Sequence, residues 1–180
     1  MSQFVNYQKR SLTLPSGCKN LIDVLTLPRQ QAKGNIPACG FPSLDIKEDR
    51  VPTAGLAQVR RYVSMLLQSR GELFTVSVTA HNFKFPVTLY RIKRDQTVAI
   101  MVVTNETRQE RAIRTFFEQQ GLEAIFDQVE TSDARRGLAY PLPFDVARVT
   151  SLTTELLRSV YGLSAEAGLN FRYYEMETAL

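Results

Sequence analysis

The sequence predicts a single α+β domain, in which helices pack on one β-sheet, preceded by an extended N-terminal arm. Prolines gather in residues 1–52, which hold five of the eight. Strand-like runs follow between residues 73 and 103. Stripes of apolar residues at helical spacing lie before and after these runs. We therefore expect residues 1–52 to form the arm and residues 53–180 to form a compact domain.

The arm combines frequent prolines with many apolar side chains. Proline fixes φ and lacks an N–H group, so neither a long helix nor a central strand is expected, and only Lys19–Leu25 has the spacing of a short helix. At least thirteen large apolar side chains lie in the arm, too many to leave in water, so the arm should pack on its own domain or on another chain. The candidate partner-binding residues here are Phe4, Tyr7, Leu21 and Ile22.

The compact domain is expected to begin with a helix and an antiparallel meander. Thr53 can cap a helix whose apolar stripe runs from Leu56 to Leu67. Three strands joined by short links follow, and the third is apolar throughout, which is typical of a central strand covered on both faces. These strands are Leu73–Ala80, Phe85–Lys93 and Val98–Val103.

The second half returns to helices. Thr107 and Glu110 have the spacing of a capping box. Asp145 can cap a second helix, which stops at Gly162. We expect strands at Glu123–Val129 and from Leu169 to Tyr173, with a polar loop from Glu130 to Phe144. The predicted order is α-β-β-β-α-β-α-β in a single mixed sheet.

Composition and charge exclude several protein classes. Hydrophobic residues make up 44% of the 180 and charged residues 22%, the balance of a globular protein. No apolar run approaches the ~18–20 residues of a membrane span, and the first ten residues lack a signal-peptide core, so we expect a cytoplasmic protein. Residues 1–105 hold 14 Lys/Arg against 6 Asp/Glu, and residues 106–180 hold 8 against 12. This split favours an acidic partner or head-to-tail association of copies, unless it is only an uneven solvated surface.

The sequence offers no recognisable catalytic constellation. His81 is the only histidine, and it lies at the expected tip of a hairpin. Cys18 and Cys39 have no histidine nearby to complete a zinc site. Glycine-rich phosphate loops are missing as well. We therefore expect no catalytic residue, no metal site and no cofactor.

The element order of residues 54–128 resembles the core of restriction-endonuclease-like nucleases. The resemblance implies an acidic residue on the second strand and an acid-x-Lys pair on the third, which hold magnesium. This chain has Arg91 and Lys93 on the second strand and no charge in Val98–Val103, so it resembles such a fold without its catalytic acids. The same order also suits secretion-chaperone-like and other small α+β binding domains.

Two further groups of side chains are candidates for binding. Cations near the second hairpin turn can neutralise phosphates, and an aromatic ring can stack on bases. These candidate nucleic-acid-binding residues are Arg91, Lys93, Arg94 and Phe83. Paired arginines and aromatics in the expected loop are typical interface anchors, unless the aromatics pack back on the domain. These candidate partner-binding residues are Arg135, Arg136, Tyr140 and Phe144.

The leading hypothesis is a non-enzymatic protein-interaction domain. It would be a subunit or adaptor in an assembly, with the N-terminal arm docking on a neighbouring chain and a protein partner or homo-oligomer as the result. The alternative is a nucleic-acid-binding domain of nuclease-like topology.

Overall fold

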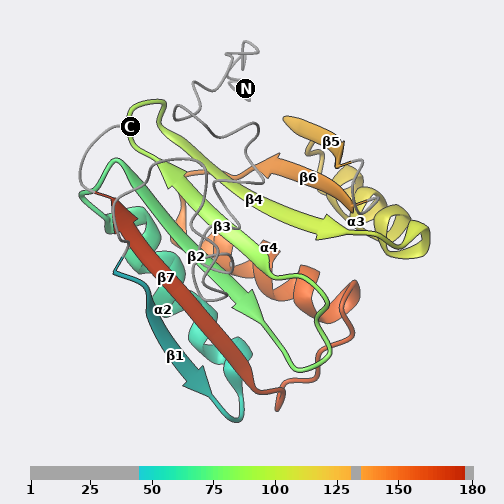
Figure 1. The fold of residues 1–180 in the computed structure, drawn as a ribbon, viewed down its shortest axis with the longest axis horizontal. Coiled ribbons are helices and arrows are strands. Elements are labelled where there is room, and N and C mark those ends of the chain that lie inside the picture. The colour runs from blue at the N-terminus through green and yellow to red at the C-terminus, as the bar shows by residue number, and fades with distance from the viewer. Residues whose placement is uncertain (1–44, 131–134, 177–180) are drawn as a thin grey trace. The chain divides into compact units, whose positions relative to one another are not determined.

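The computed structural model describes residues 45–130 and 135–176. Its described strands form one antiparallel sheet of seven strands in the order β1-β7-β2-β3-β4-β6-β5 (Figure 1). The helices are α2 (Gly55–Gln68), α3 (Thr107–Gln119) and α4 (Val146–Ser159). The strands are β1 (Lys47–Val51), β2 (Leu73–Thr79), β3 (Val87–Ile92), β4 (Thr97–Thr104), β5 (Phe126–Glu130), β6 (Arg135–Pro141) and β7 (Leu169–Met176).

Each helix connects two strands that run in the same direction but are not neighbours. β7 lies between β1 and β2, which α2 connects, and β6 lies between β4 and β5, which α3 connects. The connection through α4 joins β6 to β7 across β2, β3 and β4. The first two are split β-α-β units, in which one inserted antiparallel strand separates the parallel pair.

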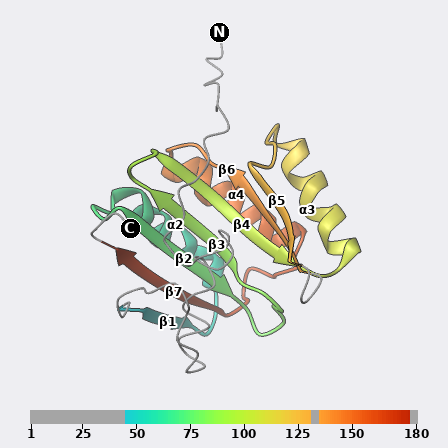
Figure 2. The same ribbon diagram turned by 45° about the horizontal axis from the view of Figure 1, so that its top comes forward.

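The three helices share one face of the sheet. Side chains from α2, α3 and α4 join the same apolar core as one set of alternate strand residues. Tyr62 of α2 stacks on Phe171 of β7 with ring centroids 3.9 Å apart, and Phe117 of α3 stacks on Tyr140 of β6 at 3.8 Å. Figure 2 shows α2 and α4 behind the sheet, with α3 near β5. We call this side of the sheet the helix side.

The predicted fold class is confirmed as one sheet with helices packed on it. The meander β2-β3-β4 is antiparallel, as predicted. Asp145 caps α4 and accepts a hydrogen bond from the backbone N–H of Arg148 at 2.7 Å. The predicted capping box is wrong, because Glu106 rather than Thr107 occupies the N-cap position of α3 and makes no side-chain capping hydrogen bond.

Two strands were not predicted, and they change the character of the sheet. β6 lies within the expected loop, where arginines, a glycine and a proline obscure the alternation of Arg136, Leu138 and Tyr140. Because β6 inserts between β4 and β5, every described strand pair is antiparallel, whereas we expected a mixed sheet. β1 lies within the residues assigned to the arm, and its charged sequence suits an edge strand that pairs with β7 alone. The helix expected at Lys19–Leu25 lies outside the described residues.

Candidate interaction face

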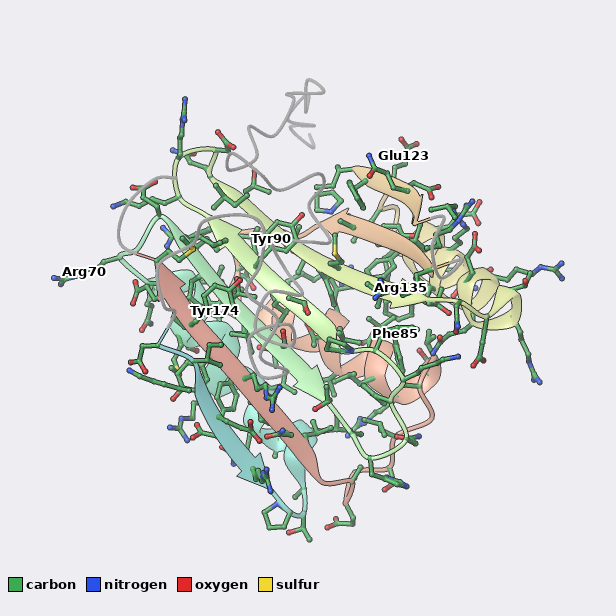
Figure 3. The ribbon with its side chains drawn as sticks, viewed as in Figure 1. Arg70, Phe85, Tyr90, Glu123, Arg135 and Tyr174 are labelled. Atoms are coloured by element: carbon green, nitrogen blue, oxygen red, sulfur yellow. The ribbon has the colours of Figure 1, made fainter. Side chains whose placement is uncertain are left out.

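The sheet face opposite the helices carries no charged side chain on its three central strands. We call it the helix-free face, and Figure 3 views the molecule from this side, with Tyr90 and Tyr174 labelled. An antiparallel sheet face that meets water normally carries polar and charged residues. The central residues of the helix-free face are Leu73, Thr75, Ser77 and Thr79 of β2, Thr88, Tyr90 and Ile92 of β3, and Thr97, Ala99, Met101 and Val103 of β4.

The middle of the helix-free face is as thoroughly buried as the helix-side core, while Thr79, Ile92 and Thr97 at the strand ends are half-buried. Thr75, Tyr90 and Ala99 have 0% of their surface exposed, and Met101 has 1%. The same face of β7 contributes Tyr174, at 2%. None of these residues belongs to the core cluster that the helices share. The described helices pack on the other face, so they do not account for this burial.

Polar groups without partners are buried within this apolar surface. Ser77 and Thr88 satisfy each other, with their hydroxyl oxygens 3.1 Å apart. By contrast, the Tyr90 hydroxyl and the Asn170 Oδ1 have no hydrogen-bond partner in the described part of the chain. Burial raises the pKa of Tyr90 above its usual value and raises that of Tyr174 to about 12, so both hydroxyls stay protonated and able to donate. A buried polar group without a partner costs about 1–3 kcal/mol, so the Tyr90 hydroxyl and the Asn170 Oδ1 each favour a hydrogen-bonding partner.

Charges on this face are confined to its borders. Glu48 of β1 accepts hydrogen bonds from Arg172 at 2.7 Å, from the Asn170 amide at 3.0 Å and from Arg50 at 3.1 Å. These hydrogen bonds, that of Asn170 foremost, lower the pKa of Glu48 to about 2. The Glu48 carboxylate therefore stabilises the pairing of the edge strand β1 with β7.

Glu48→Gln is expected to destabilise the domain at neutral pH and to lose that effect in acid. The pKa of Glu48 in the folded state lies below its ordinary value of 4.5, so its contribution is complete above pH 4.5 and disappears as the pH falls towards about 2. Because the side chain is partly exposed, we expect a difference of about 1 kcal/mol in the free energy of unfolding. Urea unfolding of both proteins from pH 7 to pH 2 measures it. Glu123→Gln, at an exposed position, is the control, and a difference that did not change with pH would contradict the assignment.

The structure separates the four partner-binding candidates predicted at residues 135–144. Tyr140 is 3% exposed within the helix-side core. Arg136 lies on the same side, with its Nη1 3.1 Å from Glu110 and 3.4 Å from Asp127. Arg135 alternates to the helix-free face at the end of β6. Phe144 is 64% exposed just before α4.

The nucleic-acid-binding candidates do not form one cluster. Arg91 donates to the backbone carbonyl of Ser69 at 2.6 Å, and Lys93 donates to that of Arg70 at 3.2 Å, so both hold the segment that follows α2. The Arg91 guanidinium also lies 5.8 Å from the Phe144 ring. Phe83 lies before the opposite end of β3, where its ring packs on Tyr161 at 4.6 Å. Arg94 is exposed in the turn between β3 and β4.

Phe4, Tyr7, Leu21 and Ile22 lie outside the described residues. Sequence reasoning missed the helix-free face as a candidate site, although two signals were present. Thr75, Ser77 and Thr79 alternate without a charge, and Val98–Val103 is apolar on both faces. Together they indicate a sheet whose two faces are both covered.

A pocket of about 420 Å³ opens where β1, β2 and β7 meet the adjoining loops. Its lining includes His81, Arg50 and Asn170 but no serine, cysteine or carboxylate. His81 is exposed, and the pocket wall holds no carboxylate to orient it. The hydroxyl of Thr79, which also lines the pocket, donates to the backbone carbonyl of Asn170 at 3.5 Å.

Residues 45–130 and 135–176 contain no group of three or more His, Cys, Asp or Glu side chains placed to hold a metal ion. None of the helices in these residues is long and apolar enough to cross a membrane. In comparisons with protein-family models, curated proteins and solved structures, nothing matches this chain.

Proposed function

We propose that this chain is a non-enzymatic cytoplasmic protein-interaction domain that works as a subunit of an assembly. The binding surface is the helix-free face, and the partner segment is the N-terminal arm of a neighbouring copy. The arm supplies apolar side chains that need burial, and the helix-free face is an apolar surface whose burial the described helices do not provide.

The absence of charge from β2, β3 and β4 on the helix-free face is the observation that supports this proposal. On these three strands, the eleven alternate residues that lie on this face have only apolar, hydroxyl-bearing or tyrosine side chains. The helix side of the same strands does include a charge, at Arg91. An extensive apolar surface with a charged border is the usual anatomy of a protein interface.

Light scattering on the full chain tests this proposal. The chain has a mass of 20.4 kDa, so the assembly should have a mass that is a multiple of this value. Dissociation to the monomer is expected only at low protein concentration. Native mass spectrometry of mixed ¹⁴N and ¹⁵N copies should then give mixed species. A monomer at every concentration would overturn the proposal.

The nucleic-acid alternative draws less support from the geometry. Two of its three cations, Arg91 and Lys93, are hydrogen-bonded to backbone carbonyls, and its aromatic residue, Phe83, packs on Tyr161 at the other end of β3. Salt-dependent retention of the full chain on immobilised DNA or RNA would be the result that revives it.

A further inference from the structure

The centre of the helix-free face is a row of side chains with two tyrosines. Tyr174, Thr75, Tyr90 and Ala99 lie directly opposite one another on β7, β2, β3 and β4. Adjacent strands are about 4.8 Å apart, so the two tyrosines are separated by roughly 10 Å with the smaller Thr75 between them. Rigid aromatic side chains on either side of a small residue suit an extended chain that lies across the strands.

The unpaired Tyr90 hydroxyl defines the chemistry of whatever lies on this row. It can donate to a carbonyl. A helix uses its backbone carbonyls internally, whereas an extended or polyproline segment leaves them free. The surface therefore favours an extended segment, because such a backbone offers free carbonyls along its length.

Residues 1–44 have the composition and the length of such a segment. They contain Pro15, Pro28, Pro37 and Pro42, and proline disfavours a helix interior and favours an extended backbone with free carbonyls. They also hold five Lys/Arg and one Asp, so these 44 residues carry the whole net charge of +4, while residues 45–180 hold 17 of each sign. Fully extended, 44 residues span about 145 Å, far more than the ~29 Å width of a seven-stranded sheet. The arm can therefore leave β1 and reach the sheet of a neighbouring copy.

We propose that the row Tyr174–Thr75–Tyr90 binds residues 1–44 of a neighbouring copy as an extended, proline-containing segment. The Tyr90 hydroxyl donates a hydrogen bond to one of its backbone carbonyls. This inference rests on the proposed function only for the claim that the segment comes from a neighbouring copy. The claim that residues 1–44 lie on the row can be tested separately.

Photocrosslinking in the full chain tests which segment lies on the row. Benzoylphenylalanine in place of Tyr90 should crosslink to peptides from residues 1–44. The same probe at Gln128, which is exposed on the same face of the edge strand β5, is the control and should give few such crosslinks. Crosslinks from position 90 that all fall within residues 45–176 would overturn the inference.

Isotope labelling separates this inference from the proposed function. In a mixture of ¹⁴N and ¹⁵N copies, crosslinks between light and heavy chains support the neighbouring copy as the source. Crosslinks to residues 1–44 that never mix isotopes would overturn the assembly, and with it the neighbouring source, while identifying the same segment on the face.

A conservative variant tests the hydrogen bond and guards against a probe that disturbs folding. Tyr90→Phe in the full chain should speed amide hydrogen exchange in residues 1–44 about fivefold, the equivalent of one neutral hydrogen bond. Tyr161→Phe removes another buried hydroxyl that has no partner in the described part of the chain, and it should leave this exchange unchanged. Equal exchange in all three proteins would overturn the role of the Tyr90 hydroxyl.

Discussion

Met101→Glu is expected to lower the free energy of unfolding of the full chain by about 3 kcal/mol or more at pH 7. Met101 is 1% exposed on the helix-free face, between Thr88 and Ala139 on the neighbouring strands. None of the three central strands has a cation on this face to pair with a carboxylate. If the face is covered, the new charge is buried without compensation. Urea unfolding at pH 7 measures the loss, and light scattering measures whether the assembly persists.

Two comparisons isolate the charge in this experiment. Met101→Gln has a similar shape without the charge. Burial raises the pKa of the new carboxyl in the folded state, so the difference in stability between the two variants should decrease as the pH falls from 7 and should vanish below about pH 4.3, where the carboxyl is protonated in both states. Gln128→Glu places the same carboxylate at an exposed position of the same face and should change the stability by no more than about 0.5 kcal/mol. A loss below about 1 kcal/mol for Met101→Glu would mean that the face meets water.

The sequence predicts most elements of the fold because their patterns are local. The stripe from Leu56 to Leu67 and the alternation in Leu73–Thr79 each depend on a few adjacent residues. β6 was missed because its inward-facing residues include Arg136. That arginine can lie on the helix side only because Glu110 and Asp127, from other elements, form ion pairs with it. β1 was missed because four charged residues form a strand only when β7 is available to pair with them.

The candidate face is harder to predict, because it depends on how the whole sheet is assembled. Tyr174 and Thr75 are 99 residues apart in sequence and become neighbours only when β7 pairs with β2. The apolar run in β4 indicates two covered faces, yet it does not say which face receives the helices. That choice follows from three connections between parallel strands that place α2, α3 and α4 on one side. Sequence reasoning therefore selected conspicuous single residues, whereas the face consists of inconspicuous threonines, alanines and tyrosines.

Tyr140→Ala is expected to cost about 3–5 kcal/mol of unfolding free energy, the range for removing a large buried aromatic side chain. In the sequence, Tyr140 and Phe144 look equivalent, as two aromatic anchors four residues apart. In the structure, Tyr140 stacks on Phe117 at 3.8 Å and is 3% exposed, while Phe144 is 64% exposed. Phe144→Ala should therefore leave the stability within about 0.5 kcal/mol of the parent protein.

Urea unfolding of both variants, with light scattering beside it, separates a folding role from a binding role. Tyr140→Phe keeps the ring and should be nearly as stable as the parent, because the stacked ring, rather than the hydroxyl, fills the core. If Tyr140→Ala were as stable as the parent but failed to assemble, Tyr140 would be an interface anchor and its place in the helix-side core would be wrong. If Phe144→Ala alone reduced assembly at unchanged stability, the exposed ring beside Arg91 would join the helix-free face as a second contact surface.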